Sequence, residues 1–362
     1  MTETTLAAGQ GRYNNLEGLR GIAALAVVAG HIERHKPDFG FKQLPIPFLS
    51  SLGSVAVTVF FVLSGFVITD MLLKEISRSN TIHIRHFYAR RVLRIFPLYF
   101  LVLLLCCILY ADSISAKGIL LSVFFLPNVA FLEYLLPPIL YPIWSIGVEE
   151  QFYAVHPFIM KHLQPERLPL LFGVIILVEI IVRNLYLLPV LSPYSFFSAL
   201  HNFLLFARYD TILVGCIAAV YFKRLSMQRN KKWVLAKKVQ YAAVLLFCLM
   251  LLLTVMYDII QHEVYAFISA IIIINLCKPE TSIISIGSKP FIFLGKISYG
   301  IYLLHKFALF AVLYLLSKLP ATGLFMQNLI VYFAVTAAGI VLASLSYQWF
   351  ERFFLRQKAR YV

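Results

Sequence analysis

Long apolar stretches separated by short polar breaks recur from one end of this 362-residue chain to the other. A helix that crosses the hydrocarbon core of a bilayer needs about 20 apolar residues. Hydrophobic residues make up 60% of the chain and charged residues only 14%, whereas soluble domains carry about 25% charged residues. The sequence therefore predicts an all-α polytopic membrane protein without a separate soluble domain.

Eleven stretches are apolar enough to be candidate spans. They are 21–35, 53–73, 95–111, 119–133, 143–160, 168–188, 202–222, 239–257, 264–277, 291–316 and 326–347. Basic residues are concentrated in 74–94, 223–238 and 351–362, and the positive-inside rule assigns these three segments to the cytoplasm. Five candidates separate the first two basic segments, so one of the five must not cross. The weakest is 119–133, which contains Pro127-Asn128, and we expect it to be re-entrant or interfacial.

Ten transmembrane helices then remain, with both termini in the cytoplasm. A polar N-terminal tail, 1–15, precedes a single transmembrane domain, 16–353, and a basic cytoplasmic tail, 354–362, follows it. The expected outward segments are 36–52, 112–142, 189–201, 258–263 and 317–325. The first residues lack the order of a cleavable signal peptide, so we expect no processing.

The net charge of +15 is explained by these basic loops, and it does not indicate a nucleic-acid partner. The five cysteines all lie in apolar segments, where cysteine behaves as a small hydrophobic residue. Their positions imply neither a disulfide framework nor a metal site.

Arg20 and His31 lie in the first apolar run, eleven residues apart. Over that interval a helix turns three times plus about 20° and rises about 16.5 Å, so the two side chains share one face. Ionisable groups inside a bilayer are costly and normally face a cavity or a partner. One interpretation is structural, with Arg20 as a cytoplasmic anchor and His31 bonded to another helix. The other is catalytic, because histidine suits general-base chemistry near neutral pH.

Arg91 and Arg94 are one helical turn apart where a cytoplasmic segment enters the third span, and two guanidinium groups there can clamp a phosphate. The alternative is that they are ordinary basic residues flanking a span on its cytoplasmic side.

Glu149 and Glu150 open the fifth candidate span, 143–160, and point about 100° apart, so at most one faces a given cavity closely. The main alternative for them is an ion pair with a residue such as Arg208.

Polar residues in other apolar runs are candidates for substrate binding. These are Trp144, Ser64, Asp210 and Tyr299. Gly65 and Gly300 permit close helix approach. His305 is a second ionisable group of the same kind, although a packing role is the simpler interpretation for it.

Six of these stretches, taken in order, resemble the acyltransferase family 3 of integral membrane proteins, which acylate exported or cell-surface carbohydrates and some small molecules. The stretches are "LEGLRGIAALAVVAGH", "FFVLSGF", "RRVLRIFPLY", "WSIGVEEQFY", "SYGIYLLH" and "YQWFERF", and they extend from Leu16 to Phe353. The resemblance implies that Arg20 and His31 match the family's essential pair and that Arg91 and Arg94 match its pair for the acyl donor. It also implies ten spans and a bacterial inner membrane.

On this basis we expect an O-acyltransferase that moves an acyl group, most simply acetyl, from cytoplasmic acyl-CoA to a hydroxyl of a glycan such as lipopolysaccharide or exopolysaccharide. His31 acts as general base or forms an acyl-histidine, Glu150 or Glu149 orients the acceptor or the histidine, and Arg20, Arg91 and Arg94 bind the donor. The chain ends without the soluble hydrolase-like domain of some members, so we expect that it acts alone or passes its product to a partner protein. The rival interpretation is a proton-coupled transporter or flippase that uses the same groups.

Overall fold

The computed structural model describes residues 3–191, 194–227, 233–253, 260–320 and 323–361. All regular secondary structure in these ranges is helical. The α-helices are α1 (Glu3–His35), α2 (Phe48–Ser79), α3 (Ile84–Leu109), α4 (Ala116–Val123), α5 (Pro127–Leu132), α6 (Ile143–His162), α7 (Leu168–Arg183), α8 (Ser195–Ala207), α9 (Tyr209–Met227), α10 (Lys237–Leu252), α11 (Gln261–Leu276), α12 (Lys289–Lys296), α13 (Ser298–Leu316), α14 (Leu324–Ser346) and α15 (Arg352–Gln357).

Five of the described helices are long and apolar enough to cross a membrane. They are Phe48–Ser79, Ile84–Leu109, Leu168–Leu187, Ser298–Leu316 and Leu324–Gln357, and the bent pair α8 and α9 makes a sixth if it is one span. The protein is therefore a multi-pass helical membrane protein. The count of ten spans and the cytoplasmic position of both termini stay predictions.

Parts of several predicted segments lie outside the described residues. They are residues 1–2 of the N-terminal tail, 192–193 and 321–322 of two outward loops, 228–232 of the second basic segment, 254–257 of the span 239–257, 258–259 of the next loop, and 362 of the C-terminal tail.

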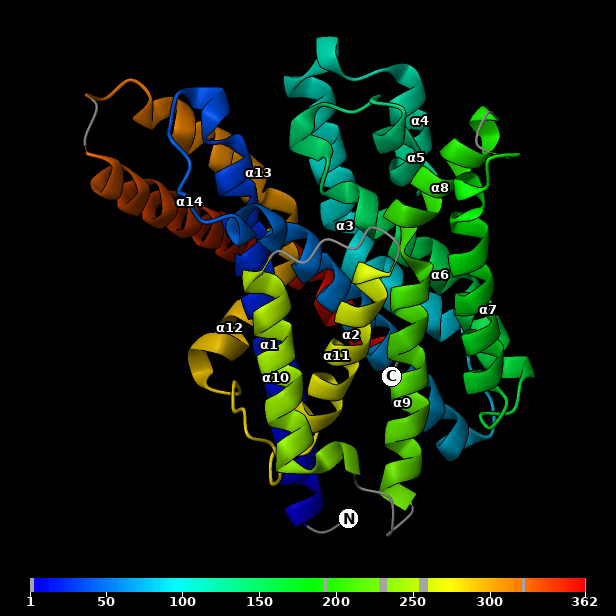
Figure 1. Cartoon of the computed structure of the whole chain (residues 1–362). Helices are drawn as coiled ribbons and strands as arrows, with labels where there is room; N and C mark the ends of the chain where they lie inside the picture. The colour runs from blue at the N-terminus through cyan, green and yellow to red at the C-terminus, as the bar shows by residue number, and fades with distance from the viewer. Residues whose placement is uncertain (1–2, 192–193, 228–232, 254–259, 321–322, 362) are drawn as a thin grey trace.

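Segment 119–133 does not form one continuous helix. It is divided between α4 and α5, which meet at Phe125 with a left-handed φ of 57°. Eight helical residues rise only about 12 Å, so neither helix is long enough to cross a bilayer. At one end of the bundle (Figure 1) α4 packs on α3 and α5, and α5 packs on α6 and α8, and Pro127 and Asn128 are buried against protein. This arrangement is typical of a re-entrant or interfacial segment, which does not span the membrane.

Two predicted spans are interrupted, contrary to expectation. The span 202–222 breaks at Arg208, where φ is 51° and α8 meets α9 at a 40° bend. The Arg208 guanidinium stabilises this break by donating to the Ser54 carbonyl at 3.1 Å and to the Ser54 hydroxyl at 2.9 Å. The span 291–316 breaks at Ile297, where the Ser298 hydroxyl donates to the Gly295 carbonyl at 2.7 Å and so satisfies the end of α12.

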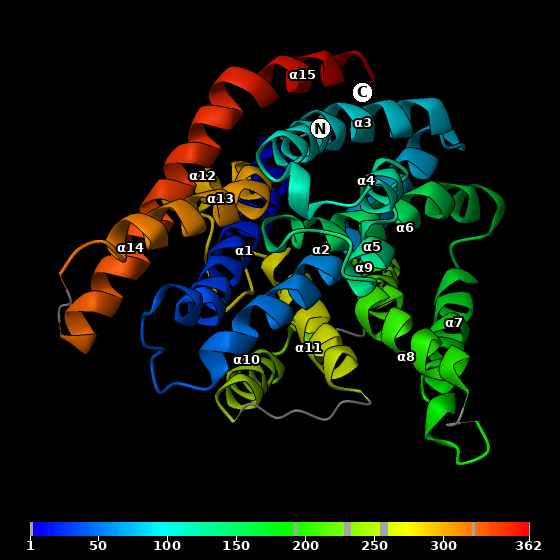
Figure 2. The same cartoon turned by 90° about the horizontal axis from the view of Figure 1, so that it is seen from above.

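Helices α1, α2 and α9 form the centre of the bundle, and α14 and α7 lie at its periphery (Figure 2). Glycines allow this tight centre: a Cβ on Gly215 of α9 would lie 2.0 Å from the Val62 carbonyl oxygen of α2, and one on Gly65 would lie 2.0 Å from the Ile212 carbonyl oxygen. Such close backbone approach is common between membrane helices. It fixes α2 as one wall of the cavity described next.

Candidate active site

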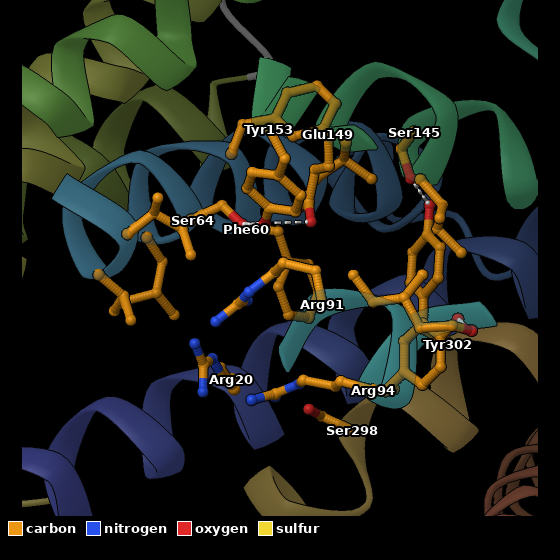
Figure 3. Close-up of a pocket in the computed structure, with 18 of the residues that line it drawn as sticks. Arg20, Phe60, Ser64, Arg91, Arg94, Ser145, Glu149, Tyr153, Ser298 and Tyr302 are labelled. Atoms are coloured by element: carbon orange, nitrogen blue, oxygen red, sulfur yellow. Dashed lines mark hydrogen bonds between the residues drawn. The ribbon is translucent and has the colours of Figure 1, made fainter. Parts of the chain in front are cut away.

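A cavity of about 310 Å³ lies among α1, α2, α3, α6, α13 and the C-terminal segment. Small-molecule sites have volumes of about 300–1,000 Å³. Its wall combines apolar residues of α2 with a polar set from all of these elements (Figure 3). The polar lining residues are Glu17, Arg20, Ser64, Arg91, Arg94, Ser145, Glu149, Tyr153, Ser298, Tyr299, Tyr302 and Lys358.

Three guanidinium groups converge on one part of this cavity, Arg20 from α1 and Arg91 and Arg94 from α3 (Figure 3). Arg20 Nη1 donates to Glu17 Oε1 at 2.8 Å. Arg91 lies instead over the rings of Phe87 and Tyr153, at 5.9 and 5.6 Å from their centroids. Among the described residues no carboxylate is within ion-pair distance of Arg91 or Arg94, and Arg91 Nε is buried without a hydrogen-bond partner. Arg91 is buried and Arg94 half-buried, and cations in such positions without an ion-paired carboxylate favour an anionic ligand.

Lys358 adds a fourth positive side chain, at a position that no sequence motif indicates. The 3₁₀ turn Lys358–Tyr361 packs on α3, where Arg90 Nη1 donates to the Tyr361 carbonyl at 2.7 Å. Burial, together with the positive charges of Arg94 and Arg91, lowers the pKa of the Lys358 ammonium to about 8. No local pattern in the tail indicates this position, because the turn is brought to the cavity by the path of α14 and α15.

The two adjacent carboxylates of α6 point in different directions, as neighbouring helical residues must. Glu149 lines the cavity and accepts a hydrogen bond from the Tyr153 hydroxyl at 2.9 Å. Ser64 also lines the cavity, with its hydroxyl 2.6 Å from that of Tyr153. Glu150 does not line the cavity, and its Oε1 is buried without a partner. Tyr299 lies on the wall and donates to the Ile95 carbonyl at 2.7 Å.

Two predicted substrate-binding residues lie elsewhere. Asp210 is fully buried and accepts from Arg183 Nη1 at 3.2 Å. Trp144 packs among aromatic rings with the Arg208 guanidinium 5.7 Å from its centroid. Neither residue lines the cavity. The ion pair of Arg208 with a glutamate of α6 is not formed either, since its described hydrogen bonds go to Ser54, Thr58 and the Leu205 carbonyl.

His31 lies next to the cavity wall rather than on it. Its Nδ1 is 2.7 Å from Nε2 of His305, and the two rings are stacked with centroids 4.9 Å apart. Tyr302 connects this pair to the cavity, because it lines the cavity and its ring centroid is 6.2 Å from that of His305. His305 is completely buried, whereas His31 is partly exposed. The interpretation of His305 as a packing residue missed its contact with His31.

The buried Arg91, the half-buried Arg20 and Arg94, and the carboxylate of Glu149 thus give this multi-pass helical membrane protein an internal polar pocket, with a histidine pair beside it. The chain belongs to the acyltransferase domain family, whose sequence pattern matches residues 13–348. The resemblance seen in the sequence motifs is therefore confirmed over nearly the whole chain.

Curated relatives share about a quarter of their residues with this chain. The protein named "Peptidoglycan O-acetyltransferase OatA" from Listeria monocytogenes is 26% identical over 93% of this chain and 55% of its own length. The Bacillus subtilis protein named "Putative peptidoglycan O-acetyltransferase YrhL" is 27% identical over 93% of this chain and 54% of its own. A Staphylococcus aureus protein named "Putative O-acetyltransferase SACOL0978" is 26% identical over 94% of this chain and 57% of its own. The chain thus spans little more than half the length of these relatives. No solved structure is significantly similar to it.

Proposed function

We propose that this protein is a membrane-embedded O-acyltransferase that transfers an acyl group, most simply acetyl, from cytoplasmic acyl-CoA to a hydroxyl of a cell-envelope carbohydrate. The observation that carries this proposal is the cluster of Arg20, Arg91, Arg94 and Lys358 on one cavity, in a chain of the acyltransferase family. The names of the relatives support acetyl as the group and a glycan as the acceptor.

The donor site fits the chemistry of acyl-CoA, whose phosphates carry several negative charges. The lining contains four cationic side chains and two carboxylates, and one of these carboxylates, Glu17, is paired with Arg20. The uncompensated charge on Arg91 and Arg94 would be satisfied by phosphate oxygens. The apolar wall from α2 would accommodate the uncharged acyl arm, directing it toward Tyr302.

His31 then serves as the general base. Its Nε2 accepts the proton of the acceptor hydroxyl while the hydroxyl oxygen attacks the thioester carbon. The carbon–sulfur bond breaks, and the resulting imidazolium returns the proton to the leaving thiolate. Base catalysis of this kind contributes about 10²–10⁴-fold to the rate. Formation of an acyl-histidine by Nε2 itself uses the same nitrogen.

The donor and the acceptor reach the reaction from different sides in this proposal. His31 is partly exposed although it does not line the donor cavity, so a hydroxyl can approach it without entering through the basic cluster. Glu149, held by Tyr153 at the cavity wall, is placed to orient polar groups of the bound molecules. With the basic segments in the cytoplasm, this arrangement modifies a glycan on the outer side of an inner membrane.

Purified protein in detergent tests the function directly. Acetyl-CoA labelled in its acetyl group and a panel of glycan fragments should yield free CoA and an acetylated glycan in equal amounts, and the matched His31→Ala protein should yield neither. The transporter alternative predicts movement of a solute across proteoliposomes without consumption of acetyl-CoA. That result, with no acetylated product from any acceptor, would overturn the proposal.

A further inference from the structure

The hydrogen bonds around His305 define which of its nitrogens carries a proton. Its Nδ1 lies 2.8 Å from the Tyr302 carbonyl oxygen and 3.1 Å from the Ile301 carbonyl oxygen. Carbonyl oxygens only accept hydrogen bonds, so Nδ1 must carry the proton that is shared between them. In a neutral imidazole the other nitrogen is then an acceptor.

A neutral His305 ring is consistent with its surroundings. The side chain is completely buried, its described hydrogen bonds go only to the two carbonyls and to His31, and the next residue is the buried Lys306. A second buried positive charge at this place would lack the paired carboxylate that buried charges need. His305 Nε2 is therefore an acceptor, and it lies 2.7 Å from His31 Nδ1.

This contact determines the tautomer of His31. Because His305 Nε2 accepts, His31 Nδ1 must donate, and the neutral His31 ring then has its lone pair on Nε2. Among the described residues nothing is hydrogen-bonded to His31 Nε2. The hydrogen-bond chain therefore runs from the backbone carbonyl oxygens through His305 to His31, and it ends at the basic Nε2 of His31.

We infer that His305 is a positioning residue that holds His31 in the Nδ1–H tautomer through a hydrogen-bond chain anchored on the backbone of α13. The inference rests on the proposed function for its catalytic meaning, since a base or nucleophile at Nε2 needs its lone pair there in every turnover. The backbone carbonyls give the chain a fixed polarity, because a carbonyl cannot reverse its role. The stacked ring of His305 also limits rotation of the His31 imidazole.

The tautomer is measurable without any activity assay. In full-length protein labelled with ¹⁵N-histidine, the shifts of the two ring nitrogens distinguish protonated from bare nitrogen. We expect a protonated Nδ1 and a bare Nε2 for neutral His31, assigned by loss of its signals in His31→Ala. We expect His305→Leu to give a mixture of both His31 tautomers. A protonated Nε2 on neutral His31 in the wild-type protein would overturn the inference, and this readout needs only the His31→Ala variant, for the assignment.

Kinetics of acetyl transfer then test the consequence. In His305→Leu, kcat should fall at least about 100-fold while KM for acetyl-CoA stays unchanged, because only the orientation of the base is lost. In His305→Gln the side-chain carbonyl can still accept from His31 Nδ1–H, so kcat should stay within about tenfold of the wild type. His156→Leu is the matched control, because His156 of α6 is equally buried and lies outside the cavity lining, with Nε2 2.9 Å from the Thr69 hydroxyl.

Equal losses of kcat in the Leu and Gln variants, or an equal loss in His156→Leu, would overturn the positioning role. A failure of the proposed function gives a different pattern: the wild-type protein would form no acetylated product with any acceptor while its ¹⁵N spectrum still showed the expected tautomer. The two failures are therefore distinguishable.

Discussion

His31 gives the sharpest distinction between a catalytic and a structural histidine. We predict that His31→Ala and His31→Gln both abolish acetyl transfer while both proteins still bind acetyl-CoA, because the donor is held by arginines elsewhere. Glutamine can form a hydrogen bond but cannot accept a proton near neutral pH. Transfer rates and donor binding, measured on the same monodisperse preparations, test this. Substantial transfer by His31→Gln would leave only the inter-helix bond to His305 as its role.

The arginines of α3 allow a matched comparison on one helix. Arg94→Ala should raise the Kd for acetyl-CoA about 10- to 100-fold, since a charge-assisted bond to phosphate is worth about 1.5–3 kcal/mol. Arg85→Ala should leave Kd unchanged, because Arg85 begins the same helix but is exposed and lies outside the cavity. Binding of the wild type should also weaken as salt rises. Equal effects of the two substitutions on Kd would mean that acetyl-CoA binding depends only on the overall surface charge.

The C-terminal tail contributes a titratable cation to the donor cavity. The pKa of Lys358 is lowered to about 8, so its ammonium is present below that pH and is lost as the pH rises through it. We predict that the affinity for a non-hydrolysable acetyl-CoA analogue falls by up to about tenfold between pH 7 and 9, as one phosphate contact is lost. In Lys358→Arg the guanidinium stays charged, so affinity should be flat over this range. An identical pH dependence in the variant would remove Lys358 from the donor site.

The close contact of α2 and α9 provides a test of the packing. Gly215→Ala places a methyl group 2.0 Å from the Val62 carbonyl oxygen, and backbone cannot move aside as a flexible side chain can. We expect a loss of stability of about 1–3 kcal/mol or more, seen as a lower midpoint of thermal unfolding in detergent. Gly173→Ala in α7 is the control, since a Cβ there meets nothing within 4 Å. A similar midpoint for both variants would contradict the tight packing of these helices.

Individual helices were predictable to different extents. The interruption of 119–133 follows from Pro127, whose restricted geometry is local and visible in the sequence. The breaks at Arg208 and Ile297 were not predictable, because they depend on contacts to other segments. Arg208 reaches back to Ser54 on α2, and α12 ends where Gly295 meets the Glu17 carbonyl of α1, 2.1 Å from an added Cβ. Hydropathy along a single span does not contain that information.

The orientation of the whole bundle is a prediction that labelling can test. In Figure 1 the N-terminus lies at the same end as the end of α9 and the start of α10, and α4 and α5 lie at the opposite end. In a cysteine-free background of intact cells, a cysteine at the exposed position Asp112 should react with a membrane-impermeant thiol reagent, and one at the exposed position Lys238 should not. Labelling at Lys238 would invert the assigned sides.

The site as a whole was predictable only in part. The resemblance to the family, together with the one-turn spacing of Arg91 and Arg94, led us to expect Arg20, Arg91 and Arg94 at one donor site, and all three line the cavity. The adjacency of Glu149 and Glu150 predicted that at most one of them faces it closely, and only Glu149 does. The partner of His31 was not predictable, since 274 residues separate it from His305 and no pattern encodes pairing over that range. The same limitation applies to Lys358 and explains why Asp210 and Trp144 were assigned to the cavity although they belong to neighbouring buried clusters.

One continuous helix, α1, carries both Arg20 and His31, so the distance between the two side chains is fixed. The two residues are about 16.5 Å apart along its axis, and no hinge interrupts the helix between them. A donor gripped by its charged end at Arg20 presents its reactive carbon at a set depth in the bilayer, whatever the acyl group. Selection among thioesters would then depend on the length of the chain between the phosphates and the thioester. A short thioester without phosphates would not be held at the position that brings its carbonyl to the imidazole.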